Sequence, residues 1–158
     1  MKRHDSLIPL THDHHHALSQ ARCMQLAADS APDGRLAQTR EFLQFFETDT
    51  VAHFQEEEES VFPMVIDEEA AQPFLSRAML DHLRIYAFVR LLRSEIARGD
   101  VSGVTMTRLA ETLQHHIRFE EKVLFPMIER MVPNILLCEV SLQPRQRAPQ
   151  QNVSIGIE

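Results

Sequence analysis

Glycine, tryptophan and cysteine are scarce in this sequence. Its 158 residues include four glycines, no tryptophan and two cysteines. The β-branched residues are scattered rather than grouped as they are in strands, which argues against a sheet protein. Long stretches rich in Ala, Leu, Glu, Gln, Arg and Met instead favour helix throughout.

Other absences bear on location and partners. No stretch approaches the ~20 apolar residues that a membrane span needs, and Met1 to Asp13 lack the apolar run of a secretory signal. The net charge is −7 with histidine neutral, which argues against nucleic acid or an anionic membrane as a partner, because those partners need a basic face. Cys23 and Cys138 form no metal or redox motif, which indicates free thiols in a reducing compartment. We therefore expect a cytoplasmic protein.

Apolar residues recur at helical spacing in four segments, 11–28, 33–66, 73–98 and 102–131. Thr11 and Asp33 are the expected N-caps of the first two segments, and Gly99 is the expected stop of the third. The connections are short, so neighbouring helices should be antiparallel, which gives an all-α, up-down-up-down four-helix bundle. Residues 1–138 are expected to form one domain. The polar tail 139–158 has no periodicity and should be extended or disordered.

An internal repeat supports two related helical hairpins. Residues 53–65 read HFQEEEESVFPMV and residues 116–128 read HIRFEEKVLFPMI, with six of thirteen positions identical at an offset of 63. A weaker repeat at an offset of 68 relates Asp13-His14 to Asp81-His82. Each hairpin thus has one single His on its first helix and one His-x-x-x-Glu motif on its second.

Each His-x-x-x-Glu motif places an imidazole and a carboxylate on nearly the same helix face. That face is apolar in both motifs, as it is around the two single histidines. The apolar neighbours are Phe42, Phe46, Val61 and Met64 for His53 and Glu57; Leu109, Leu113, Val123, Leu124 and Met127 for His116 and Glu120; Leu75, Met79, Ile85 and Val89 for His82; and Leu7, Leu10, Leu18 and Ala21 for His14. We therefore expect these four histidines and two glutamates in the interior of the bundle.

A buried set of four imidazoles and two carboxylates needs partners, because unpaired buried charges are costly. Either motif alone would be an ordinary core histidine or a surface ion pair, but the matched repetition favours a two-metal site. The glutamates would bridge two cations and each histidine would supply one nitrogen. Mixed nitrogen and oxygen ligation suits iron best, with manganese or zinc as alternatives; zinc alone usually shows Cys or three His.

This arrangement resembles the hemerythrin HHE cation-binding family over about residues 7–132. The family signature has a single His on the first and third helices and a His-x-x-x-Glu-Glu-x-x-Leu-Phe-Pro motif on the second and fourth. The resemblance implies a non-heme di-iron centre of the Fe-O-Fe type. In that centre Glu57 and Glu120 bridge the metals and the four histidines are terminal ligands. It also implies O₂ chemistry, iron handling or redox sensing.

Tyr86 stands where the sequence departs from oxygen-carrying hemerythrins. Those proteins are similar but have a fifth histidine at this position, one turn beyond the single His of the third helix, and an Asp in place of Glu120. Tyr86 is therefore a candidate cofactor contact with three open roles. The three roles are ligation of ferric iron, donation of a hydrogen bond to a bound ligand, and packing against neighbouring side chains.

Several polar neighbours of the expected ligands have other expected positions. Helical phase directs His12 and His16 to solvent and leaves a supporting position open to His15. Glu58 and Glu121 occupy the same motif position, and one of them is expected to orient a ligating imidazole.

Three functions follow from this set. The first is a protein that binds O₂ or NO, handles iron or senses oxidants. The second is an enzyme that activates O₂ or peroxide, such as a ferroxidase or peroxide scavenger. The third is a structural or regulatory domain holding another metal or none. The sequence contains no nucleophile triad, phosphate loop or substrate motif, so we rank them in this order.

Overall fold

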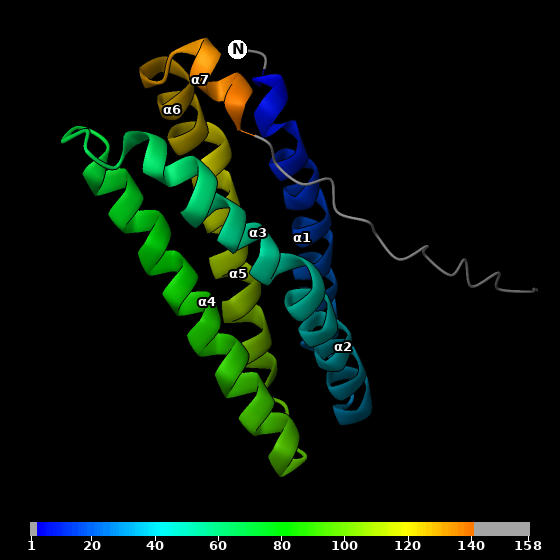
Figure 1. Ribbon diagram of the computed structural model, residues 1–158. Coiled ribbons are helices and arrows are strands. Elements are labelled where there is room, and N and C mark those ends of the chain that lie inside the picture. Colours follow the sequence, from blue (N-terminus) through cyan, green and yellow to red (C-terminus); the bar gives the residue numbers. More distant parts are fainter. Residues whose placement is uncertain (1–2, 141–158) are drawn as a thin grey trace, which may run out of the picture.

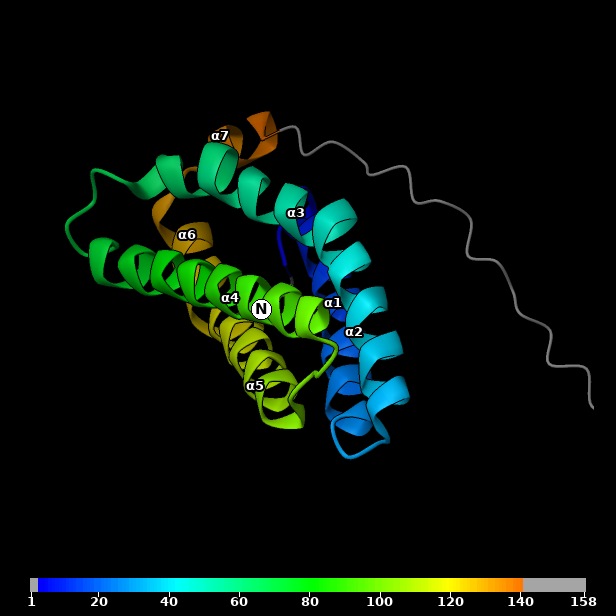
Figure 2. The ribbon, with the colours of Figure 1, turned by 90° about the horizontal axis from the view of Figure 1, so that it is seen from below.

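The computed structural model describes residues 3–140, and every regular element within them is helical. Successive long helical segments run antiparallel to one another, which confirms the predicted all-α bundle (Figure 1). Seen from below, residues 8–45 lie on one side of the bundle and residues 72–119 on the other, while residues 51–65 run across the top of the view (Figure 2). Within residues 3–140 no helix combines the length and apolarity needed to cross a lipid bilayer.

The first hairpin begins with the short η1 (Asp5–Leu7) and α1 (Ile8–Ala27). Its second arm consists of α2 (Pro32–Phe45), η2 (Phe46–Thr50), α3 (Val51–Glu56), η3 (Glu57–Val61) and η4 (Phe62–Val65). Both arms start earlier than predicted, because Pro9 and Pro32 occupy first-turn positions. Proline suits these positions, since its missing N–H would have no partner there anyway.

The second hairpin comprises α4 (Gln72–Arg98), α5 (Gly103–Phe119), η5 (Glu120–Leu124) and α6 (Phe125–Met131). Gly99 ends α4 with a left-handed φ of 75°, which glycine adopts without a Cβ penalty. The Ser102 hydroxyl accepts a hydrogen bond from the Thr105 N–H and caps α5. A short helix that the sequence pattern did not predict, α7 (Asn134–Glu139), follows Pro133. Of the predicted tail, residues 141–158 lie outside the described residues.

Both His-x-x-x-Glu motifs lead into a turn of π-helix. In η3 the Phe62 N–H reaches back to the Glu57 carbonyl, and in η5 the Phe125 N–H reaches back to the Glu120 carbonyl. A proline follows immediately in each case, and its ring would clash with the carbonyl four residues earlier in a regular helix. The wider turn before each proline thus lets the helical arm continue past it, and such turns are frequent at functional sites.

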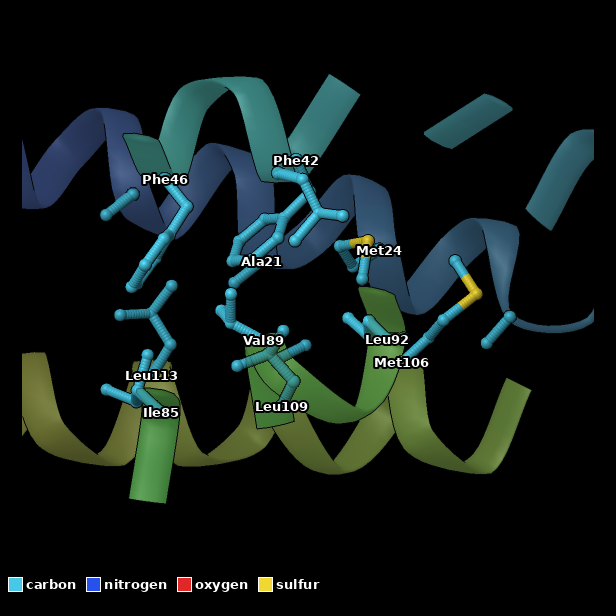
Figure 3. Close-up of a cluster of buried hydrophobic side chains, with 14 of the residues drawn as sticks. Ala21, Met24, Phe42, Phe46, Ile85, Val89, Leu92, Met106, Leu109 and Leu113 are labelled. Carbon is cyan, nitrogen blue, oxygen red and sulfur yellow. The ribbon is translucent and has the colours of Figure 1, made fainter. Parts of the chain in front are cut away.

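Two apolar clusters fill the bundle and leave the expected ligands between them. The first cluster contains Ala21, Met24, Phe42, Val89 and Leu109, with other residues of α1, α2, α4 and α5 (Figure 3). The second contains residues nearer the other end of each arm, among them Leu10, Val61, Ala78, Leu124 and Phe125. Along each arm the polar ligand candidates fall where one cluster gives way to the other.

Two residues predicted to face inward are partly exposed. Val123 is 38% exposed, because the π turn that begins at Glu120 inserts an extra residue and shifts the helical phase, which buries Leu124 fully. Met79 is 37% exposed, and its neighbour Ala78 occupies the fully buried position. The prediction was wrong for both residues. Each lies beside a buried residue of the same apolar helix face.

Candidate metal centre

The structure brings the six predicted ligands together in the interior. None of them is more than 5% exposed. They form two groups of potential metal ligands, and within each group the ligand atoms lie within 4.8 Å of one another. The first group is His14, His53, Glu57 and Glu120, and the second is Glu57, His82, His116 and Glu120. The two glutamates belong to both groups, whereas each histidine belongs to one.

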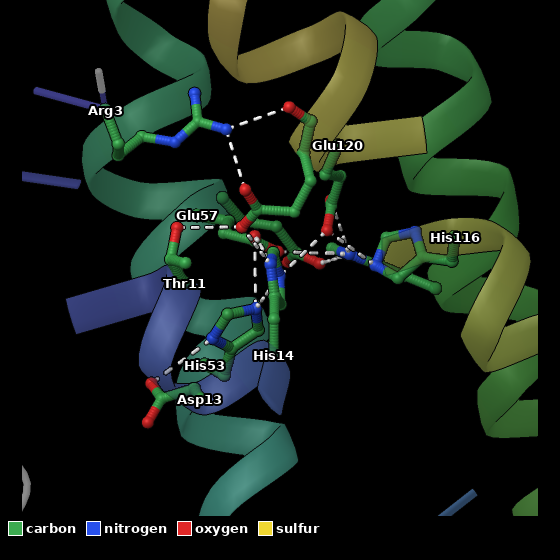
Figure 4. A network of polar contacts seen from close by, with 11 residues as sticks. Arg3, Thr11, Asp13, His14, His53, Glu57, His116 and Glu120 are labelled. Atoms are coloured by element: carbon green, nitrogen blue, oxygen red, sulfur yellow. Dashed lines mark hydrogen bonds and ion pairs between the residues drawn. The ribbon is translucent and has the colours of Figure 1, made fainter. Parts of the chain in front are cut away.

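The two oxygens of Glu57 face different groups. Oε1 lies 3.1 Å from Nε2 of His53, and Oε2 lies 3.3 Å from Nε2 of His82. Glu120 also lies between the groups, because its Oε2 is 3.2 Å from Nε2 of both His14 and His116 (Figure 4). Both carboxylates therefore lie between the two groups of imidazoles.

The facing nitrogens of His14 and His53 indicate a cation most directly. Their Nε2 atoms are 3.0 Å apart, while the Nδ1 atoms face the carboxylates of Glu121 and Asp13. A neutral imidazole has only one N–H, and the carboxylate contacts assign that N–H to Nδ1. Two Nε2 lone pairs would then point at one another. Such an arrangement is repulsive unless a proton or a metal ion lies between them.

Buried donors and acceptors without partners are concentrated in the same place. Both oxygens of Glu57, both oxygens of Glu120 and the Nε2 atoms of His82 and His116 are buried and make no hydrogen bond. Folded proteins rarely leave so many buried polar atoms unsatisfied. The donor set of imidazole nitrogens and carboxylate oxygens fits transition-metal ions, so the residues fit a metal pair.

Electrostatics give the same result, because the pKa values of the two buried glutamates are shifted in opposite directions. Burial by itself would raise the pKa of Glu57, but the nearby imidazoles of His53 and His82 hold that pKa well below its usual range. Burial, followed by the charge of Glu57, raises the pKa of Glu120 well above its usual range. Burial also lowers the pKa of His116 well below its ordinary value. Metal binding would therefore displace a proton from the cluster.

Two carboxylates orient imidazoles across the two hairpins. Glu121 Oε1 lies 2.7 Å from Nδ1 of His14, and Glu58 Oε1 lies 2.7 Å from Nδ1 of His82. The sequence predicted this role for one of the two residues at this motif position, and the structure gives it to both. Each glutamate reaches the single histidine of the other hairpin.

Asp13 was not predicted as a partner of a ligand. Its Oδ2 lies 3.4 Å from Nδ1 of His53. The signal in the sequence was the repeated Asp-His pair, in which Asp13 matches Asp81.

Glu121 is itself held from two further sides. The Arg3 guanidinium donates to its Oε2 at 2.7 Å, and the Thr11 hydroxyl donates to its Oε1 at 2.8 Å. Burial alone would raise the pKa of Glu121, but the hydrogen bonds from His14, Arg3 and Thr11 lower it to about 2. Glu121 is thus a charged carboxylate that three hydrogen-bond partners hold beside Nδ1 of His14.

Tyr86 lies apart from both ligand groups. Its ring packs edge-on against Phe46 and Phe54, with centroids 5.4 and 5.9 Å apart, and the residue is 40% exposed. Phe54 in turn stacks on His82 with a centroid distance of 3.7 Å, so this ring lies between Tyr86 and that ligand candidate. Burial, followed by the charge of Glu58, raises the pKa of Tyr86, which favours the protonated phenol. Of the three roles considered for Tyr86, these contacts fit packing.

A small cavity adjoins the first ligand group. It offers about 20 Å³ to the centre of a water-sized molecule, and a single water needs roughly 10–15 Å³ by this measure. His14, His53, His116, Thr50, Leu113 and Ile117 are among its lining residues. His16, which was predicted to be solvated, also lines it and is half-buried, whereas His12 and His15 are exposed. The Thr50 hydroxyl is buried and has no hydrogen-bond partner.

Comparison with known proteins identifies one family. The profile described as Hemerythrin HHE cation binding domain matches residues 7–128, which include all six ligand candidates. No curated protein and no solved structure matches the chain.

Proposed function

Because the chain belongs to the family of hemerythrin HHE cation-binding domains, we propose that it binds two iron ions and presents them to a small ligand such as O₂ or NO. The ligands would be His14, His53, Glu57, His82, His116 and Glu120. The observation that carries the proposal is the pair of ligand groups that share Glu57 and Glu120. Shared carboxylates between two sets of imidazoles are what a bridged metal pair requires.

The composition of the two groups supports iron. Each group offers two imidazoles and two carboxylates and contains no cysteine. Nitrogen and oxygen donors suit iron, and manganese and zinc are the competing ions. Four protein ligands at each position leave further coordination positions open, which is the arrangement used for reaction with an external molecule.

The cavity beside His53 and His116 supports a ligand of two or three atoms. Its space of about 20 Å³ is close to that of one water molecule. An organic substrate would require the packed side chains of Leu113 and Ile117 to move.

The test is metal content followed by ligand binding. Protein purified after growth with iron is expected to contain close to two iron ions per chain, measured by mass spectrometry of the digested protein. The reduced protein should then bind nitric oxide with a change in its optical spectrum. One metal ion per chain, or zinc retained when iron is supplied, would contradict the di-iron proposal. Rapid, repeated consumption of added peroxide would instead favour the enzyme, the second candidate.

A further inference from the structure

The contacts around the candidate metal centre have approximate two-fold symmetry, because most contacts of one hairpin have an equivalent in the other. His14 with Glu121 matches His82 with Glu58, and both distances are 2.7 Å. The ring centroids of His14 and His53 are 4.7 Å apart, as are those of His82 and His116. This symmetry follows the sequence repeats, because the offset of 68 relates the first arms and the offset of 63 relates the second arms.

One contact lacks its counterpart under this symmetry. Nδ1 of His53 faces Asp13 at 3.4 Å. The repeat pairs His53 with His116 and Asp13 with Asp81, yet Nδ1 of His116 is buried and has no hydrogen-bond partner. His116 is therefore the one ligand candidate whose Nδ1 lacks a carboxylate partner.

Asp81 has the burial expected of that missing partner. It is only 7% exposed and precedes His82 on α4, which packs against α5, the helix that carries His116. Its Oδ1 pairs with Arg84 at 2.9 Å, and the Arg84 side chain is 57% exposed. An ion pair with so exposed a partner is weak, so Asp81 would lose little by leaving it.

We propose that Asp81 is the positioning residue of His116 and accepts the hydrogen bond of its Nδ1–H when Nε2 ligates a metal ion. This inference rests on the proposed function. Metal-ligating histidines almost always donate their other N–H to a carboxylate, carbonyl or water, because this fixes the ring and strengthens the ligand. A bound cation also polarises the N–H, which makes the carboxylate of Asp81 a better partner for His116 than for Arg84.

The test compares Asp81→Asn with Arg84→Gln in the iron-loaded chain. Asp81→Asn should weaken iron retention against a ferrous chelator by roughly 10- to 100-fold, the usual effect of losing such a partner. Asp13→Asn, the counterpart in the first hairpin, should have a similar effect. Arg84→Gln should leave iron retention unchanged or improve it, because it releases Asp81. Metal-free Asp81→Asn should unfold at a temperature close to that of metal-free Arg84→Gln.

Several outcomes would overturn the inference. If Arg84→Gln lost iron as readily as Asp81→Asn, the aspartate would matter only through its ion pair. If Asp81→Asn held iron like the wild type, it would have no role at the metal. A wild type that bound no metal would overturn the proposed function as well.

A second measurement does not depend on a variant. In the zinc-loaded wild type, the Nδ1 proton of His116 should be protected from exchange and shifted downfield in the nuclear magnetic resonance spectrum. A rapidly exchanging proton would overturn the inference.

Discussion

Replacement of Glu120 by leucine should stabilise the metal-free protein and weaken its metal binding. Both carboxylate oxygens of Glu120 are buried without a hydrogen bond. A buried polar group in this condition costs ~1–3 kcal/mol, and leucine would replace it with apolar contacts to the clusters on either side. We expect a gain of about 1–2 kcal/mol in the metal-free free energy of unfolding, which raises the melting temperature by roughly 2–8 °C for a chain of this length.

Glu95→Leu is the matched control, because Glu95 is another buried glutamate but has hydrogen-bond partners. It is 6% exposed and accepts hydrogen bonds from the Thr105 hydroxyl at 2.7 Å and the Ser102 N–H at 3.1 Å. Its removal would leave those donors unpaired, so the variant should lose ~1–3 kcal/mol. The two substitutions are chemically identical, and their effects on the metal-free protein should have opposite signs.

The assay is thermal and urea unfolding followed by circular dichroism, with a chelator and then with added ferrous iron. Metal at a thousandfold excess over its dissociation constant would stabilise the wild type by about 4 kcal/mol. Glu120→Leu should lose most of that gain, while Glu95→Leu should keep it. The reasoning is refuted if metal-free Glu120→Leu is destabilised as much as Glu95→Leu, or if it retains the full gain from metal.

Three other predictions follow from burial and contact. His53→Ala should abolish binding of iron, measured as iron content after purification, whereas His12→Ala, at an exposed position, should leave it unchanged. Tyr86→Phe should change neither the iron content nor the visible spectrum, because its ring contacts are retained; loss of a visible band would show that the phenol ligates iron. Thr50→Val should speed nitric oxide release roughly two- to thirteenfold, the effect of one hydrogen bond worth ~0.5–1.5 kcal/mol. Thr39→Val, which removes another buried and unpartnered hydroxyl, should not; equal release rates in the two variants would exclude a role for Thr50.

The sequence alone predicted the helical bundle and the six residues that meet in its interior. Spacing of four places His53 with Glu57, and His116 with Glu120, on single helix faces. The apolar residues of the same faces show that those faces point inward. The repeat then relates the two hairpins, because it pairs positions that lie far apart in the chain. These signals depend on helical periodicity, and a sequence displays that periodicity directly.

Local backbone changes altered the details of that prediction. The prolines after each motif are visible in the sequence, but the π turns that accommodate them are not. One such turn exposes Val123 and buries Leu124, since an extra residue rotates everything that follows it. Residues beyond that turn therefore do not keep the phase of an uninterrupted helix.

Only the tertiary structure decided which side chains meet across helices. It paired Glu121 with His14 and Glu58 with His82, each across the two hairpins, and it placed Asp13 beside His53. It also placed Tyr86 against Phe46 and Phe54. The helical phase alone had predicted that Tyr86 faces the metal ligands, because it lies one turn beyond His82. Periodicity fixes the direction of a side chain from its own helix axis, whereas the distance and rotation between helices depend on how all the buried side chains pack together.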